Sequence, residues 1–491
     1  MFRRIGVFVV VLLGLWTNYG WASDGVLNIA IPADPDTFDP HRTVAAATAE
    51  IAFNVYEGLV KAGPHGEVEG ALAEYWELDE TRTVYTFYLR DAKFHDGTSV
   101  TVDDVAAALN KARDPNVSQR AAELEDVESI TPLEGAVRIK LKQPNSAFLY
   151  TLSEVAAVVY PKDASNLAVQ PVGTGPYRLV EWRPNQYVKL ERFDQHWSEK
   201  TPYYKEVYFR IIPDENSMVL NLKSGRIDLI PRLEASVLHQ VEHDPSLKVL
   251  SGPMNVVQVL AINNERPPFD DWRVRKALSL AVNKEEVIMG AAWGYGKELH
   301  SGISPAMAVF YNDELSQVNP YDPDQARALL KEAGFENLSF TLVLPAAYPL
   351  HVQTGELVAD QWKQIGIDVD IQIVEWGTWL ERVYNQRDYD VSIIGLAGRL
   401  DPHAILVRYK TGNSRNFFNF SNTHYDELID MGLLAEGEER VRIYKEAQRI
   451  LAEEAAGVFI MDPPHLAVMS KRIQGWQHYP TYVVDAASLY Q

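Results

Sequence analysis

The sequence contains no cysteine among its 491 residues. This absence excludes disulfide bonds, catalytic thiolates, iron–sulfur clusters and cysteine-ligated zinc. It also excludes a lipoprotein, because the lipid of a lipoprotein is carried by a cysteine at the cleavage site. We expect no bound metal and no cofactor, since the His239 and His243 pair at i, i+4 supplies too few ligands for a closed metal site.

Basic residues are also scarce relative to acidic ones. The chain has 46 Lys and Arg against 67 Asp and Glu, which gives a formal net charge of -21. Nucleic-acid binding needs basic surface to neutralise phosphates, and docking on anionic lipid needs juxtamembrane cations. Both classes of partner are therefore excluded, and the charge is typical of a soluble protein.

The local motifs of the common hydrolases and nucleotide-binding enzymes are missing. The sequence has no G-x-x-x-x-G-K-[ST], no H-E-x-x-H and no G-x-S-x-G. Lys410-Thr411-Gly412 resembles one element of the β-lactamase triad, but no Ser-x-x-Lys accompanies it. We therefore expect a protein that is not an enzyme and has no catalytic residues.

The N-terminus has the three regions of a cleavable export signal. Arg3 and Arg4 are followed by an apolar run over 5–16, and small residues follow with Gly20 at −3 and Ala22 at −1. The apolar run is too short to span a bilayer comfortably, although a membrane anchor is the alternative. We predict a signal peptide over 1–22 and a periplasmic product, because a chain without lipid would need an outer membrane to be retained.

Apolar residues alternate with a period of two or recur with a helical period along most of the chain. Between about 320 and 400 helices and strands alternate, which indicates an α/β layer with a parallel or mixed sheet. The expected order is helix 325–333, strand 338–344, helix 354–365, strand 367–375, helix 377–386 and strand 389–395. The region 75–215 is richer in strands. Two architectural styles in one chain predict at least two lobes.

Residues 71–115 read ALAEYWELDETRTVYTFYLRDAKFHDGTSVTVDDVAAALNKARDP. The segment contains a hydrophobic strand, a tight turn at His95-Asp96-Gly97 and a helix that Thr101 can cap. This block resembles the signature of the family 5 extracellular solute-binding proteins. Six more blocks support the resemblance in order: FDPHRT at 38–43, YEGLV at 56–60, VGTGPYRLVEW at 172–182, LKSGRIDLI at 222–230, INNERPPFDDWRVRKALSLAVNKEEV at 262–287 and YDPDQARALLKEAGF at 321–335.

The resemblance implies a two-lobed periplasmic binding protein fold, type II, of the large cluster with an extra subdomain. It places lobe one at 23–58, 171–262 and 458–491, the extra subdomain at 59–170 and lobe two at 263–457, with hinge crossings near 262 and 458. It also implies that a monomer captures a small solute, such as a short peptide, and passes it to an ABC permease and its ATPase. The resemblance leaves nickel chelates, opines and oligosaccharides open as other solutes.

The resemblance also suggests a ligand site in the cleft between the lobes. In peptide-binding relatives the ligand backbone pairs with a protein strand, and the matching stretch here is Ile394 to Ala397. Gly395 and Ala397 would offer main-chain groups, with Leu396 between them. Trp376 matches a tryptophan that lines the side-chain pockets, although a tryptophan of the core is nearly as good an interpretation.

One position departs from the peptide-binding pattern. Where such relatives carry an aspartate for the ligand amine, this chain has Arg399, which would hold an anion instead. Either Asp401 takes over the amine, or the ligand is bound differently. Arg399 either points to solvent, pairs with Asp401, or is free for ligand because Asp401 points elsewhere. His403 follows in the same loop, and Asp34 and Arg120 complete the candidate ligand-binding residues.

A secreted hydrolase is the alternative from another class. It would need a nucleophile with a base, or paired acids in a pocket. No local motif of the sequence proposes such a pair, so the binding protein is the better interpretation.

Overall fold

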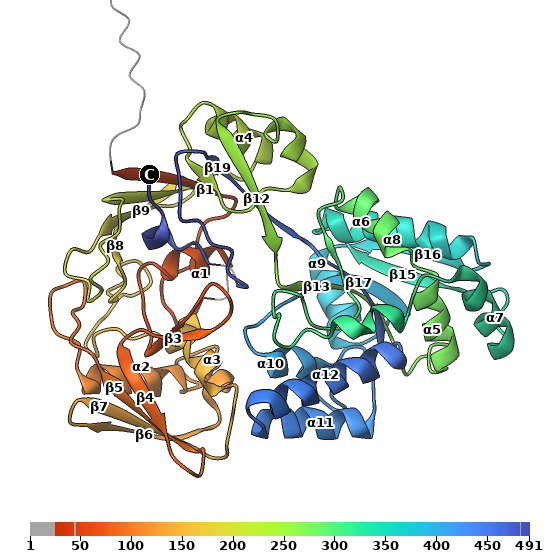
Figure 1. Ribbon diagram of the computed structural model, residues 1–491, viewed down its shortest axis with the longest axis horizontal. Helices are drawn as coiled ribbons and strands as arrows, with labels where there is room; N and C mark the ends of the chain where they lie inside the picture. The colour runs from red at the N-terminus through yellow and green to blue at the C-terminus, as the bar shows by residue number, and fades with distance from the viewer. Residues whose placement is uncertain (1–24, 44–45, 482) are drawn as a thin grey trace, which may run out of the picture.

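The computed structural model describes residues 25–43, 46–481 and 483–491. The expected signal peptide, 1–22, lies outside the described residues. The described chain forms two lobes that lie side by side (Figure 1).

A seven-stranded sheet forms the centre of the first lobe. Its order is β12-β19-β11-β1-β10-β9-β8. The strands are β1 (Val26–Ile31), β8 (Tyr177–Arg183), β9 (Tyr187–Arg192), β10 (Glu206–Ile211), β11 (Leu229–Ile230), β12 (Leu247–Pro253) and β19 (Pro464–Ser470). Helices α1 (Ala46–Ala52) and α4 (Glu215–Lys223) belong to this lobe, and Leu27 and Ile29 of β1 lie fully buried in its core.

A four-stranded antiparallel sheet forms the extra subdomain below the first lobe in Figure 1. Its order is β4-β5-β7-β6, and a small β2-β3 pair precedes it. The elements are β2 (Val60–Ala62), β3 (Val68–Gly70), β4 (Ala73–Leu78), β5 (Val84–Leu89), β6 (Val127–Leu133), β7 (Ala136–Leu141), α2 (Val102–Ala112) and α3 (Phe148–Leu152). The strand-rich composition that we noted over 75–215 reflects this subdomain and strands β8 to β10.

A six-stranded mixed sheet forms the centre of the second lobe. Its order is β14-β18-β13-β17-β15-β16, where β14 is Lys297–Glu298, β18 Gly457–Asp462, β13 Val256–Ile262, β17 Val391–Ala397, β15 Ser339–Pro345 and β16 Asp368–Val374. The helices are α5 (Trp272–Leu280), α6 (Lys284–Ala291), α7 (Pro323–Ala333), α8 (Pro349–Lys363), α9 (Trp376–Trp379), α10 (Pro402–Leu406), α11 (Thr423–Leu434) and α12 (Gly437–Glu453).

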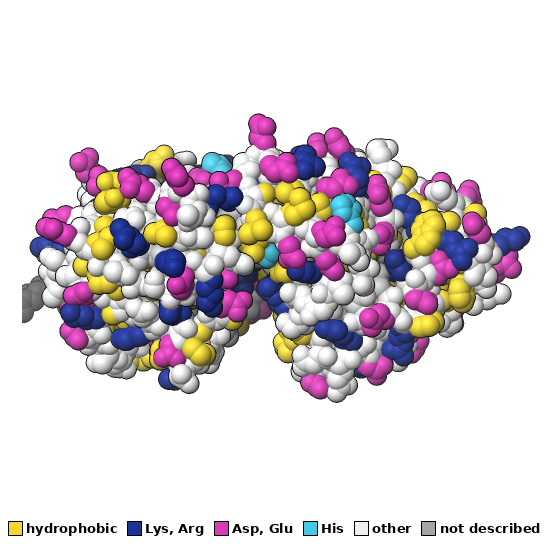
Figure 2. Space-filling view, turned by 90° about the horizontal axis from the view of Figure 1, so that it is seen from below, with side chains coloured by type: hydrophobic (Ala, Val, Ile, Leu, Met, Phe, Trp, Pro, Cys, Tyr) yellow, Lys and Arg dark blue, Asp and Glu magenta, His cyan; other side chains and the backbone are white. Residues whose placement is uncertain are grey.

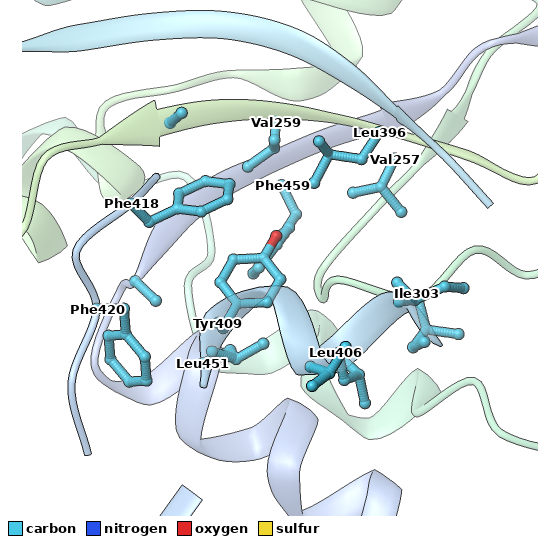
Figure 3. Close-up of a cluster of buried hydrophobic side chains, with 14 of the residues drawn as sticks. Val257, Val259, Ile303, Leu396, Leu406, Tyr409, Phe418, Phe420, Leu451 and Phe459 are labelled. Carbon is cyan, nitrogen blue, oxygen red and sulfur yellow. The ribbon is translucent and has the colours of Figure 1, made fainter. Parts of the chain in front are cut away.

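The two faces of this sheet bury two separate hydrophobic cores. Strand β13 is buried along its whole length and alternates its side chains between them: Val257 and Val259 point into one core, and Leu260 and Ile262 into the other. Figure 3 shows the first core, where Leu396 lies near Val257 and Val259. The alternation of helices and strands predicted for 320–400 is confirmed, with boundaries shifted by a few residues.

The helix caps follow local chemistry, with one correction. Thr101 caps α2 as predicted, and Asp104 returns the bond to form a capping box. The helix expected at 325–333 begins earlier, at Pro323, because Asp322 is the N-cap of α7 and its side chain accepts the N–H of Gln325.

The chain passes between the lobes twice, and both passages join one strand directly to another. β12 continues through Met254 and Asn255 into β13, while β18 continues through Pro463 into β19. Because β12 pairs with β19 and β13 with β18, the passages form one antiparallel ribbon. The boundaries that we expected at 262 and 458 therefore fall inside the sheet of the second lobe, and we propose a hinge at 254–255 and 463.

Candidate functional site

A cavity of about 920 Å³ lies where the two lobes meet. Figure 2 shows the two halves of the molecule separated by a groove, with acidic and basic side chains on both sides of it. The wall from the first lobe includes Phe53, Tyr56, Trp197 and Tyr479, whereas the wall from the second lobe is formed by Val256, residues 397–400 and Arg408. The hinge residues Met254 and Asn255 close the cavity at the junction.

Three of the predicted ligand-binding residues line this cavity: Arg120, Ala397 and Arg399. They come from the extra subdomain, the end of β17 and the loop that follows β17. The fold therefore brings Arg120 to the same cavity as two residues that lie far later in the chain.

Glu154 connects the two predicted arginines across the cleft. Its Oε2 lies 3.3 Å from Nη2 of Arg120 and 3.5 Å from Nη1 of Arg399. Arg120 also pairs with Glu123 at 3.0 Å. Burial acts to lower the pKa of Arg120, but the two glutamates outweigh it and raise that pKa. Arg399 shares Glu154 with Arg120 and remains 39% exposed, so part of its guanidinium faces open space.

Asp401 is not the partner of Arg399. It caps α10 by accepting the N–H of His403 at 2.8 Å, and its Oδ2 lies 2.6 Å from Nη2 of Arg440 in α12. Both members of this ion pair are buried, with 3% and 6% of their side chains exposed. The structure therefore matches the alternative in which Asp401 points away from Arg399.

Gly395 and Ala397 have main-chain groups that are already engaged by side chains. The Gly395 N–H donates to Nε2 of His351 at 2.9 Å, and the Ala397 carbonyl accepts from Nη2 of Arg408 at 3.3 Å. Because a main-chain N–H can only donate, Nε2 of His351 accepts this bond and must be unprotonated. Burial lowers the pKa of His351 to about 4, which keeps the imidazole neutral at pH 7.

The remaining predicted residues are not among those that line the cavity within the described ranges. Asp34 accepts Trp182 Nε1 at 3.0 Å and the N–H of Asn185, which ties the end of β1 to the β8–β9 hairpin. Trp376 is half-buried and stacks on Trp379 with ring centroids 5.1 Å apart. Leu396 belongs to the core, and His403 packs beside Tyr444.

The floor contributed by the first lobe contains a buried carboxylate, that of Glu57. It accepts Trp197 Nε1 at 2.8 Å and Thr174 Oγ1 at 3.0 Å, and His196 Nε2 lies 3.3 Å away. Burial favours the neutral acid, but the bonds from His196 and Trp197 prevail and lower the pKa of Glu57. Its charge is therefore already compensated by protein groups.

Sequence reasoning missed Arg408, Glu154, Asn255 and His351. Arg408 had a readable signal, because it interrupts the apolar run Ile405-Leu406-Val407 and Tyr409. Burial and the neighbouring guanidinium of Arg415 lower the pKa of Arg408 to about 10. Glu154, Asn255 and His351 had no local signal, since their partners come from distant parts of the chain.

A second set of contacts joins the lobes away from the hinge. In the extra subdomain, Ser146 donates its main-chain N–H to the Leu433 carbonyl at 3.0 Å and its hydroxyl to the same carbonyl at 2.9 Å. Arg82 donates to the Leu434 carbonyl at 2.7 Å and pairs with Glu436 at 2.7 Å. We call Ser146 and Arg82, with the turn between α11 and α12, the interlobe latch.

Two lobes joined by a ribbon of paired strands, with a cavity between them, define a two-lobed solute-binding protein. The family model for bacterial extracellular solute-binding proteins, family 5 Middle, matches residues 67–417. The chain belongs to this family, which consists of substrate-binding transport proteins and not of enzymes. The resemblance and the fold class read from the sequence are confirmed.

Relatives in this family cover nearly the whole chain. It is 30% identical over 457 residues to Heme-binding protein A of Haemophilus influenzae, a match that covers 84% of this chain and 82% of that protein. It is 27% identical over 513 residues to Glutathione-binding protein GsiB of Escherichia coli, covering 98% of each. Among solved structures, the binding protein AgaA of A. tumefaciens in complex with agropinic acid has a TM-score of 0.76 at 27% identity, covering 93% of this chain and 96% of that one.

Proposed function

We propose that this protein is the periplasmic solute-binding component of an ABC importer. It captures a short peptide or a similar small solute in the cavity between its lobes and delivers the solute to a membrane permease and its ATPase. The observation that carries this proposal is the cavity itself, whose walls come from both lobes and from the hinge.

The size of the cavity suits such a role. Its volume of about 920 Å³ lies within the range of roughly 300–1,000 Å³ that is usual for small-molecule sites. A solute held there would contact Arg120 from the extra subdomain and Ala397 and Arg399 from the second lobe. Because the walls belong to different lobes, solute binding would favour the closed arrangement of the lobes over the open one.

The class of solutes that we propose is broader than peptides. The names of these relatives refer to heme, glutathione and agropinic acid, which differ widely in chemistry. Nickel chelates, opines and oligosaccharides therefore remain as alternatives to a short peptide. The position of Arg399 on the cavity wall supports a solute with an anionic group.

Export and oligomeric state complete the proposal. We infer cleavage after Ala22 and a monomer in the periplasm. Within the described residues, no helix is long and apolar enough to cross a membrane. N-terminal sequencing of the purified protein should find Ser23 as its first residue, and an intact Met1 on a membrane-bound protein would contradict export.

Native mass spectrometry and small-angle scattering test the proposal together. Protein purified from its host without dialysis should carry a small-molecule adduct, because an interlobe cavity can retain its solute. After unfolding, dialysis and refolding, the adduct should be lost and the radius of gyration should rise. Returning the extracted solute should lower the radius again. A protein without adduct, whose radius no small solute changes, would rule out the proposed function.

A further inference from the structure

The carboxylates of the cavity come from one lobe, whereas its cations come from both: Lys61, Arg120 and Lys200 from the first lobe, Arg399 and Arg408 from the second. Five carboxylates line it, and among the described residues all five belong to the first lobe: Glu57, Glu69, Glu123, Glu154 and Asp485. The wall from the second lobe has two charged side chains, Arg399 and Arg408, and both are cationic. A solute in this cavity therefore meets a second-lobe wall that carries positive charge and contains no carboxylate.

Arg408 has no ion pair with a carboxylate in the described part of the chain. Within the described residues, its one hydrogen bond goes to the Ala397 carbonyl at 3.3 Å. A guanidinium has five N–H groups in a fixed fork, so this bond leaves most of its donors available. Arg399 and Arg415 are close enough to oppose the positive charge of Arg408 electrostatically. The half-buried Arg408 therefore lacks a counter-ion among the described residues, and an anionic group of the solute can supply one.

Arg399 can supply a second set of donors on the same wall. Its one carboxylate contact within the described residues, Glu154, is shared with Arg120 and lies 3.5 Å away, beyond a good hydrogen bond. The Arg399 carbonyl is held by Asn255 Nδ2 at 3.3 Å, and the neighbouring Gly398 N–H donates to the Asn255 carbonyl at 2.6 Å. A Cβ at position 398 would lie 2.1 Å from that carbonyl oxygen, so glycine is required there. The hinge residue Asn255 thus fixes the loop that presents Arg399.

The main chain of β17 is poorly placed to hold a peptide by strand pairing. Gly395 and Ala397 are two residues apart, so their main-chain groups point to the same edge of the strand. Of the four groups that they present there, the Gly395 N–H is taken by His351 and the Ala397 carbonyl by Arg408. Of these two residues, only Ala397 lines the cavity. Added-strand recognition would have to displace these side chains first.

We propose that Arg399 and Arg408, the arginine pair of the second lobe, bind a carboxylate of the solute and thereby replace the strand pairing expected for a peptide ligand. This inference rests on the proposed function and names its solute class: organic acids whose recognition does not depend on a peptide backbone. A carboxylate matches the planar fork of a guanidinium with two parallel N–H···O bonds. It would also supply the counter-ion that Arg408 lacks.

Isothermal titration calorimetry with matched acid and amide probes tests the arginine pair. The probes are trialanine, its C-terminal amide, a backbone N-methylated trialanine acid, and adipic acid with its diamide. A trehalose titration serves as a neutral probe. In the wild-type mature protein, we expect at least one acid to bind at least tenfold more tightly than its amide. Backbone N-methylation should change the affinity of trialanine less than threefold, because the peptide backbone is not recognised. Binding of adipic acid would show that a carboxylate without a peptide backbone is sufficient for binding.

Two variants separate direct contact from general electrostatics. Arg408→Gln should reduce the acid-over-amide preference to less than threefold. Arg415→Gln is the matched control, since Arg415 is an exposed neighbour that does not line the cavity, and it should retain the full preference. Circular dichroism verifies folding of both variants. If Arg408→Gln does not fold, the wild-type titrations of acid and amide alone decide whether the solute carboxylate is recognised.

The possible failures are distinguishable. Equal affinity for an acid and its amide, binding of neutral probes alone, loss of binding on N-methylation, or full preference in Arg408→Gln would overturn the carboxylate inference and leave the proposed function intact. A host-derived protein without any adduct, together with no binding by any probe, would overturn both.

Discussion

Asp462 accepts the main-chain N–H of Asn255 at 3.2 Å and so joins the two passages of the chain between the lobes. The same carboxylate accepts the N–H of Met254 at 3.1 Å and that of Val256 at 3.2 Å, and it also accepts the hydroxyl of Ser304. Asn255 adopts the left-handed conformation, with φ of +56°, which asparagine tolerates better than most residues. One buried carboxylate therefore clamps the proposed hinge.

The Asp462 carboxylate predicts a pH-dependent stability. Burial raises its pKa to about 6, although the four hydrogen bonds oppose the rise. The folded state then binds more protons than the unfolded state between about pH 4 and pH 6, so this group's stabilisation is full below about pH 4 and is lost as pH rises through about 6. The loss amounts to roughly 3 kcal/mol at most, at about 1.4 kcal/mol per pKa unit.

Urea unfolding at a series of pH values measures this contribution. The difference in free energy of unfolding between wild type and Asp462→Asn isolates it, because other titrating groups cancel. That difference should shrink by up to roughly 3 kcal/mol from about pH 4 to pH 6.5. A flat profile for Asp462→Asn would show that its pKa is not raised.

The buried pair of Asp401 and Arg440 predicts a large stability effect and no change in ligand preference. Asp401→Asn keeps an acceptor for the α10 cap but leaves Arg440 buried without an anion. We expect a loss of roughly 3–5 kcal/mol in the free energy of unfolding. Glu314→Gln removes an exposed partner of Arg449 and should cost less than about 1 kcal/mol. A similarly small cost for Asp401→Asn would contradict the role assigned to this pair.

The interlobe latch predicts a shift between open and closed forms. Arg82→Asn removes the contacts to Leu434 and Glu436 while tolerating the left-handed φ of +59° at this position. Because the latch consists of exposed contacts, we expect a modest two- to fivefold loss of solute affinity, on the order of 1 kcal/mol. Scattering should show a larger mean radius of gyration. Arg138→Asn, on the exposed face of the same sheet, should change neither quantity.

Glu154 predicts a gain of affinity on mutation. It competes with the solute for Arg399, so Glu154→Gln should increase the affinity for a carboxylate probe by roughly three- to tenfold, on the order of 1 kcal/mol. Glu123→Gln is the matched control, because Glu123 pairs with Arg120 and has no ion pair with Arg399. Calorimetry with the tightest-binding acid measures both. Equal effects of the two variants would place Arg399 outside the solute's contact range.

The sequence by itself determined the secondary structure and the fold class of this protein. Apolar periodicity, the capping box of Thr101 with Asp104 and the turn at Gly97 act over a few neighbouring residues, so local patterns suffice to read them. The ordered blocks of family resemblance then identified the two-lobed architecture, because each block is a contiguous segment.

Only the tertiary structure decided which charges meet and which main-chain groups remain free. Asp401 pairs with Arg440, 39 residues away, and the Gly395 N–H is taken by His351, 44 residues earlier. Glu154 reaches Arg399 across the cleft, and the hinge lies where two distant strands pass between sheets. Such contacts depend on how whole elements pack, and no local spacing specifies them. The counter-ion that Arg408 lacks is likewise visible only once every carboxylate around the cavity has been placed.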